Sequence, residues 1–195
     1  KIIRFHFFFL KNLKFNCYIC FMDNLLKHYK PKNLSDRIAL SFTKFLRFLA
    51  DTFFKKKYGH RAVVLETVAA VPGMVAGMLL HLKSLRKMQD DRGWIKTLLD
   101  EAANERMHLM TFIKIAKPTF IERIIIMNAQ FIFIIIYLFI YLISQKTAHR
   151  IVGYFEEEAV TSYTEYLQEI KEGKIEDIKA PEIAINYWNL PLNSK

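Results

Sequence analysis

The stretch Asn104-Glu105-Arg106-Met107-His108-Leu109 decides the fold of this chain, and it lies inside a helix predicted over residues 93–115. Glu105 and His108 are three positions apart, so both side chains leave the same face of one helix. A carboxylate and an imidazole placed in this way can hold one side of a metal ion. In carboxylate helical bundles such a pair is joined by single glutamates from neighbouring helices. The alternative is a solvated pair without a ligand, because this spacing also occurs by chance.

A second helix, predicted over residues 59–88, carries one isolated carboxylate. Between residues 62 and 80 the only ionisable side chain is Glu66. A lone carboxylate in an apolar helix is either buried as the neutral acid, or paired or bound to a metal. We favour the metal ligand. The Pro72-Gly73 step should kink or loosen this helix, and its small residues allow close packing against a neighbour.

A third carboxylate lies on the helix predicted over residues 147–171. This helix contains Phe155-Glu156-Glu157-Glu158-Ala159. An acidic triplet usually marks a solvated face, but Glu156 shares one stripe with Tyr163. That stripe places a carboxylate near a semi-buried phenol.

Composition predicts one helical domain with a basic N-terminal region. The chain has 195 residues, 52% of them hydrophobic, which is enough for one sizeable core. The first 61 residues hold 14 of the 29 Lys and Arg residues but 3 of the 19 Asp and Glu residues. Basic residues mixed with Phe and Leu suit an anionic membrane surface, and no nucleic-acid-binding motif is present. We therefore expect a basic aromatic N-terminal region over 1–33, either a leader or upstream sequence, and a helical domain over 34–195.

Two further predicted helices have alternatives that hydropathy leaves open. Residues 34–54 have an aromatic face and are followed by the basic run 55–57, which favours a helix in the membrane interface, basic side toward headgroups, over a helix on a soluble core. Residues 124–144 are uncharged and long enough to cross a bilayer, but a buried or interface-lying helix fits equally. The single pair Cys17 and Cys20 has no second pair beside it, so a zinc or redox role is not expected.

Three of these stretches together resemble the signature boxes of the alternative oxidases. They are Leu65-Glu66-Thr67, the stretch around Glu105 and His108, and the stretch around Glu156, and the segments 71–75 and 184–190 resemble that family too. The resemblance implies an all-α, ferritin-like di-iron four-helix bundle with two membrane-surface helices. It also implies a cyanide-insensitive ubiquinol:oxygen oxidoreductase that passes electrons from ubiquinol to dioxygen, gives water and pumps no protons. Such an enzyme is monotopic on the matrix side of the mitochondrial inner membrane.

The same resemblance implies a role for individual residues. It makes Glu66, Glu105, His108 and Glu156 ligands of two iron ions, and Tyr163 a redox-active catalytic residue. It places the helix with His81 and Arg86 at a homodimer interface. The quinol pocket would be lined by Arg61, Leu65, Phe155, Glu158, Ala159, Ser162, Arg47 and Asp51.

The sequence departs from the family pattern in one respect. The family has a fourth box, Arg-Ala-Asp-Glu-x-x-His, on a final bundle helix, whereas these 195 residues contain a single Glu-x-x-His. We therefore expect the final bundle helix to be missing from this chain. An inactive fragment or remnant, or another membrane-bound di-iron enzyme that modifies quinones, is the alternative function.

Overall fold

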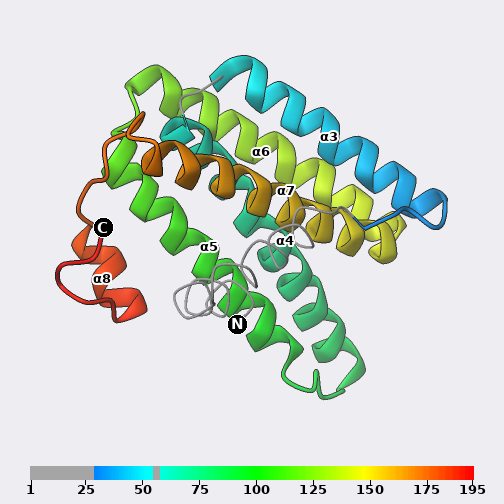
Figure 1. The fold of residues 1–195 in the computed structure, drawn as a ribbon. Coiled ribbons are helices and arrows are strands. Elements are labelled where there is room, and N and C mark those ends of the chain that lie inside the picture. The colour runs from blue at the N-terminus through cyan, green and yellow to red at the C-terminus, as the bar shows by residue number, and fades with distance from the viewer. Residues whose placement is uncertain (1–28, 55–57) are drawn as a thin grey trace.

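A computed structural model describes residues 29–54 and 58–195, and this part of the chain is all-helical. Six α-helices follow one another without a strand among the described residues (Figure 1). The predicted all-α fold class is therefore confirmed. The helices are α3 (Leu34–Phe54), α4 (Tyr58–Lys87), α5 (Trp94–Ala116), α6 (Phe120–Ile143), α7 (Gln145–Lys171) and α8 (Glu182–Trp188).

Parts of three sequence predictions lie outside the described residues. These are most of the N-terminal region 1–33, the pair Cys17 and Cys20, and the basic run 55–57. The division of the chain at residue 33 stays a prediction.

The helix boundaries follow from local signals in the sequence. α5 begins after Gly93, whose φ of 79° is left-handed, and its C-cap Lys117 is left-handed too. α6 begins with a capping box, in which Thr119 and Glu122 each accept a hydrogen bond from the backbone N–H of the other. α4 continues through Pro72 to Lys87, so the predicted weak point lies inside one continuous helix.

Among the described helices, α4 and α5 share the most extensive contact, and a glycine makes their approach possible. A Cβ atom on Gly73 would lie 2.6 Å from the backbone oxygen of Leu98 and 3.1 Å from the Cβ of Ala102. No other residue fits without moving one helix. The small residues of α4 therefore bring its Glu66 face near the Glu105 face of α5.

The core lies where α4, α6 and α7 meet. Val71, Val75 and Ala76 of α4 pack against Phe133, Tyr137 and Tyr141 of α6, and Ala148 of α7 closes the cluster. A smaller cluster joins α3 to α7 through Ala39, Ile151 and Tyr154. α8 packs on α5 at the far side of the molecule (Figure 1).

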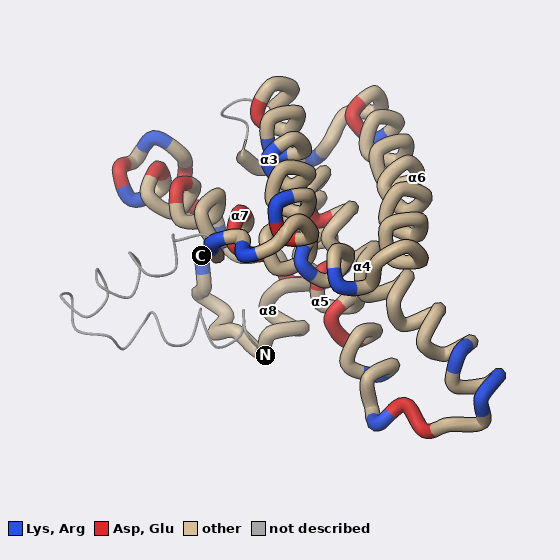
Figure 2. The backbone as a smooth tube through the Cα atoms, turned by 90° about the vertical axis from the view of Figure 1, so that its right-hand side faces the viewer, with Lys and Arg blue, Asp and Glu red and all other residues tan. Residues whose placement is uncertain are grey.

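Helices α3 and α6 lie on the same side of the molecule (Figure 1), and both carry exposed apolar side chains. The charged residues of α6 lie at its beginning, and the rest of the helix is drawn in tan, the colour of uncharged residues (Figure 2). α4 and α6 are the two described helices long and apolar enough to cross a bilayer, and α6 is mostly exposed. The exposed large apolar residues of these surfaces are Leu34, Ile38, Phe45, Phe48 and Phe53 of α3, and Phe120, Ile121, Ile124, Ile125, Met127, Phe131, Ile132, Ile135, Ile136, Phe139, Leu142 and Ile143 of α6.

The aromatic side of α3 faces outward, and part of its polar side faces the protein. Asp36 and Thr43 are buried, and Arg47 forms an ion pair with Glu158 of α7. The expectation that the basic side of this helix turns to headgroups is therefore wrong for Arg47, because the carboxylates of α7 attract it.

Candidate metal centre and adjoining pocket

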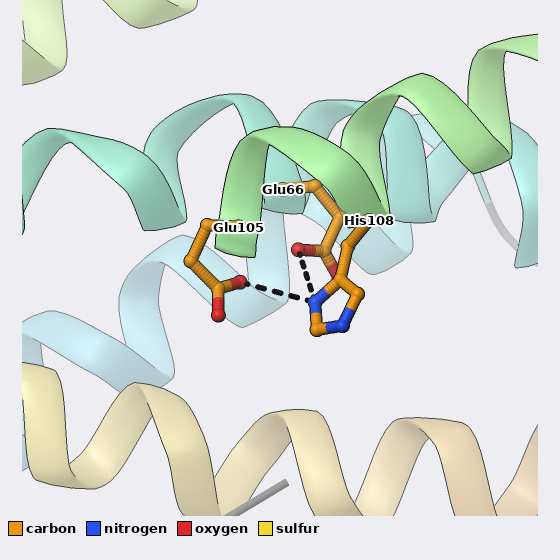
Figure 3. Close-up of side chains that lie close together, drawn as sticks. All are labelled: Glu66, Glu105 and His108. Atoms are coloured by element: carbon orange, nitrogen blue, oxygen red, sulfur yellow. Dashed lines mark ion pairs between the residues drawn. The ribbon is translucent and has the colours of Figure 1, made fainter. Parts of the chain in front are cut away.

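Helices α4 and α5 bring Glu66, Glu105 and His108 into one buried cluster (Figure 3). Glu66 and Glu105 are 4% and 5% exposed. Nδ1 of His108 lies 3.7 Å from Oε2 of Glu66 and 3.5 Å from Oε2 of Glu105. The three side chains offer two hard oxygen ligands and one nitrogen ligand to one point between the helices.

Helix α7 adds Glu156 beside this cluster. Carboxylate oxygens of Glu101, Glu105 and Glu156 lie within 4.8 Å of one another. The register of α7 separates the acidic triplet, because Glu157 accepts a hydrogen bond from the backbone N–H of Tyr29 and Glu158 pairs with Arg47. Only Glu156 of the three faces the cluster. Sequence reasoning missed Glu101, which lies one helical turn before Glu105 and so shares its face.

Burial and like charge raise the pKa of two of the carboxylates. Burial raises the pKa of Glu66 to about 7. Burial, and then the neighbouring charge of Glu105, raises the pKa of Glu156 to about 8. A cation placed between these groups would release their protons, because metal ligands bind in their deprotonated form.

The other two members of the cluster form a charged pair. Burial is the largest single influence and disfavours the charged form of each, but the hydrogen bonds and charges that join Glu105, His108 and Glu66 together outweigh it. The pKa of Glu105 is consequently lowered and the pKa of His108 is raised to about 10. A proton on His108 therefore takes the place that a cation would occupy.

The cluster fits a bound iron or manganese ion by its unsatisfied atoms and by its ligand chemistry. Among the residues that the structure describes, Oε2 of Glu66 is buried and has no hydrogen-bond partner. A buried unpaired carboxylate oxygen is costly unless an ion or proton satisfies it. Glutamates with few imidazoles are the donor set of iron and manganese sites in helical bundles.

Aromatic side chains contact the cluster of Glu66, Glu105 and His108 on two sides. The hydroxyl of Tyr163 donates a hydrogen bond to Oε1 of Glu66, and its ring stacks on Phe112 at 5.6 Å. Burial, with the charge of Glu66, raises the pKa of Tyr163 well above its usual value. On the other side Trp188 of α8 stacks on His108, with ring centroids 5.1 Å apart. Sequence reasoning placed Tyr163 here, but it missed the contact of Trp188.

A small cavity lies between α4 and α7, beside Tyr163. Its volume is about 10 Å³, room for about one water molecule. The lining residues are Tyr58, Ala62, Leu65, Ser162, Tyr163 and Tyr166. Of the predicted pocket residues, Leu65 and Ser162 therefore lie on this cavity.

The buried Arg61 reaches the same place from α4. It donates hydrogen bonds to Ser162 and to Oδ1 of Asp51, the latter at 2.5 Å. Asp51 also accepts from Arg47 at 3.4 Å. The predicted residues Arg61, Ser162, Asp51, Arg47 and Glu158 thus belong to one chain of ion pairs and hydrogen bonds.

The remaining predicted residues lie elsewhere. Phe155 is not among the cavity-lining residues but packs on Phe133 in the core, with ring centroids 5.7 Å apart. Ala159 is half-buried on α7, one turn before Tyr163. His81 and Arg86 are exposed near the C-terminal end of α4.

In the part of the chain that the structure describes, fold and site together define an all-helical protein whose bundle helices bring buried glutamates and a histidine to one candidate metal site. Residues 21–195 match the sequence model of the family described as "Alternative oxidase". The chain belongs to the alternative oxidase family.

Plant proteins are similar to this chain over most of its length. "Alternative oxidase 3, mitochondrial" of Glycine max is 57% identical over 168 residues, which are 86% of this chain and 52% of the soybean protein. "Ubiquinol oxidase 1a, mitochondrial" of Oryza sativa subsp. japonica is 56% identical over 171 residues, 88% of this chain and 52% of that protein. "Ubiquinol oxidase 2, mitochondrial" of Arabidopsis thaliana is 56% identical over 168 residues, 86% of this chain and 48% of that protein. The chain spans about half the length of the curated relatives it matches.

Proposed function

We propose that this chain carries the iron- and quinol-binding part of a cyanide-insensitive ubiquinol oxidase, which passes electrons from ubiquinol to dioxygen and forms water without pumping protons. The observation that carries the proposal is the buried cluster of Glu66, Glu105 and His108, with Tyr163 hydrogen-bonded to it and Arg61 five residues before Glu66 on α4. The names of the relatives support the substrate.

In this proposal four residues hold two iron ions: Glu66, Glu105, His108 and Glu156. Iron, when bound, supplies the redox chemistry that delivers the electrons of the quinol to dioxygen. A second Glu-x-x-His pair, which the family pattern has on a fourth bundle helix, does not occur in these 195 residues.

The side chains around the cluster have separate tasks. The guanidinium of Arg61 is buried and already donates to Ser162, so it can donate to a quinol oxygen at the same place. The hydrogen bond from Tyr163 to Glu66 lets a proton pass from the phenol oxygen to Oε1 of Glu66 without moving either helix. The stacked Phe112 excludes water from one face of that phenol.

The location follows from the exposed apolar surfaces and from the names of the relatives. We propose that the protein lies on the matrix side of the mitochondrial inner membrane and is held there by α3 and α6 without crossing it. Phe133, Tyr137 and Tyr141 keep one side of α6 packed against the bundle, while its other side is apolar and exposed.

A homodimer through the second half of α4 is part of the same proposal. His81 and Arg86 are exposed there, together with Met78, Leu82 and Leu85. Exposed apolar residues beside polar ones are typical of an interaction surface.

Oxygen uptake tests the proposed activity. The 195 residues alone, and the same residues fused to the part of the soybean relative that follows the matched region, would be loaded with iron in lipid and given ubiquinol-1. We expect cyanide-resistant, quinol-dependent oxygen uptake from the fused protein and none from the 195 residues alone, because the latter hold only one Glu-x-x-His pair. An iron-loaded, folded fusion without oxygen uptake would overturn the proposal.

A further inference from the structure

Tyr58 and Tyr166 form a stacked pair at the edge of the cavity between α4 and α7. Their ring centroids are 5.4 Å apart and their planes differ by 8°. Tyr58 is the first residue of α4, and Tyr166 lies one turn after Tyr163 on α7. Both are half-buried, so the pair stands between the cavity and the outside.

Two further contacts orient the ring of Tyr58. The guanidinium carbon of Arg61 lies 5.1 Å from its centroid, a cation–π distance. Its hydroxyl donates a long hydrogen bond, 3.4 Å, to Oε1 of Glu169 on α7. The pair is therefore an ordered surface that presents aromatic faces next to Arg61.

The cavity behind the pair is too small for any substrate ring. About 10 Å³ holds one water molecule, so a six-membered ring can enter only if a wall yields. Ala62, Leu65 and Ser162 belong to continuous helices, and Tyr163 is fixed by Glu66 and Phe112. The wall that can yield is the tyrosine pair, since both side chains are partly exposed and can turn outward without moving a helix backbone.

We propose that Tyr58 and Tyr166 position the substrate ring, which stacks against their faces and so brings a ring oxygen toward Arg61 and Tyr163. A planar aromatic quinol exchanges the tyrosine–tyrosine contact for contacts with its own ring, whereas an aliphatic molecule cannot. No bond is made or broken in this step. The inference rests on the proposed quinol oxidase function and names the residues that select a flat ring.

Binding of ubiquinone-1 to the full chain in detergent micelles tests this positioning role without requiring turnover. Titration calorimetry would compare Tyr58→Leu, Tyr58→Phe, Tyr166→Leu and Tyr166→Phe with the unchanged chain. Trp94→Leu removes an exposed aromatic ring at the start of α5 and is the matched control. Arg61→Ala probes the quinol site itself, and the thermal midpoint of each variant reports folding.

We expect each Leu variant to raise the Kd about three- to tenfold, the loss of one aromatic contact, and each Phe variant to stay within about twofold. The control should bind like the unchanged chain, and the thermal midpoints should not follow the Kd values. Leu variants that bind normally while Arg61→Ala loses binding would overturn the positioning role and leave the quinol site standing. No binding by the unchanged chain, or no effect of Arg61→Ala, would overturn the positioning role and the proposed quinol site together.

A spectroscopic measurement keeps the proposal testable if a Leu variant does not fold. A quinone stacked on tyrosine should show a weakened and red-shifted ring absorbance when it binds the unchanged chain. An absorbance spectrum that is unchanged at saturation would contradict stacking.

Discussion

Glu66 shows how one residue connects the sequence to the chemistry. It is a single carboxylate in an apolar helix, and the structure buries it between His108 and Tyr163. The lack of a hydrogen-bond partner for its Oε2 atom and its raised pKa have the same cause, since burial removes water and leaves negative charge nearby. The residue is costly to the fold unless a proton or a cation occupies the cluster.

The first prediction is that the metal-free chain loses stability as pH rises. Glu66, Glu156 and His108 all have raised pKa values, so the folded state holds protons that the unfolded state has released. The contribution of these three groups is then fully present below about pH 4.5 and is lost through pH 8 toward pH 10, by roughly 2 to 4 kcal/mol in total. Glu105, whose pKa is lowered, acts in the opposite direction, but only below about pH 4.5. Urea unfolding in excess chelator at a series of pH values, followed by circular dichroism, would measure this decline.

Glu156→Gln should flatten the part of this decline between pH 5 and pH 8, whereas Glu157→Gln, one position along on the other side of α7, should leave it unchanged. Added Mn²⁺ should reverse the pH dependence, so that stability rises with pH, because the ion replaces protons and binds better at high pH. A metal-free chain that is more stable at pH 9 than at pH 5 would show that the cluster does not hold protons as described.

The second prediction separates the role of Tyr163 in turnover from a role in holding metal. Tyr163→Phe removes the hydroxyl that donates to Glu66 but keeps the ring on Phe112. Iron content of the fused protein should therefore stay the same, while quinol-dependent oxygen uptake should fall by about 10²-fold or more. Phe112→Leu is the control that loosens the ring and keeps the hydroxyl. Equal oxygen uptake in Tyr163→Phe and the unchanged protein would exclude a redox or proton role.

Helices α4 and α5 depend on one close contact. Gly73 sits where a Cβ would lie 2.6 Å from the backbone of Leu98, and that approach sets the distance between Glu66 and Glu105. The metal centre is therefore built on helix packing as much as on ligand residues.

The third prediction tests this contact with two alanines. Gly73→Ala should destabilise the fold by about 1 to 3 kcal/mol, because a methyl group must push apart two backbones. Gly153→Ala in α7 is the matched control, since nothing lies within 4 Å of a Cβ there, and it should stabilise by about 0.5 to 1 kcal/mol. Chemical unfolding would measure both. A neutral Gly73→Ala would mean that α4 and α5 can separate freely.

Local signals explain why the elements were predictable from the sequence. Gly93, Pro118 and the Thr119 capping box mark helix ends, and the apolar spacing marks the helices between them. The register of α7 was predictable for the same reason, because Glu156 and Tyr163 share a stripe and Glu157 does not. The stack of Trp188 on His108 and the pair of Tyr58 and Tyr166 were not, since each joins helices distant in sequence.

For the whole molecule, the proposed contact with a bilayer rests on two helices and their exposed apolar surfaces. Helices α3 and α6 lie on one side of the molecule, and α5, which carries Glu105 and His108, lies on the other (Figure 1). On the side of α3, Arg47 and Asp51 begin the polar chain that ends at Ser162. Under the proposed function, a quinol dissolved in lipid would reach the cavity from this side.

The fourth prediction is that the protein binds one face of a membrane without crossing it. In inverted and right-side-out vesicles, protease should reach the loops at 89–93 and 172–181 from the same side only. The connection at 117–119 should be cleaved from that side too, because α6 returns to the bundle rather than leaving it. Cleavage of different loops from opposite sides would mean that α6 spans the bilayer.

The fifth prediction concerns the iron itself, on which the central claim depends. Anaerobic Fe²⁺ binding to the 195 residues, measured as metal per folded chain after dialysis, would compare the unchanged chain with Glu66→Gln, Glu156→Gln and Glu157→Gln. We expect the unchanged chain to hold iron at fewer than two ions per chain, because it has a single Glu-x-x-His pair. Glu66→Gln and Glu156→Gln should lose iron, and Glu157→Gln should match the unchanged chain. Iron retained in full by Glu66→Gln, or lost as much in Glu157→Gln as in Glu156→Gln, would contradict the metal centre described for these helices.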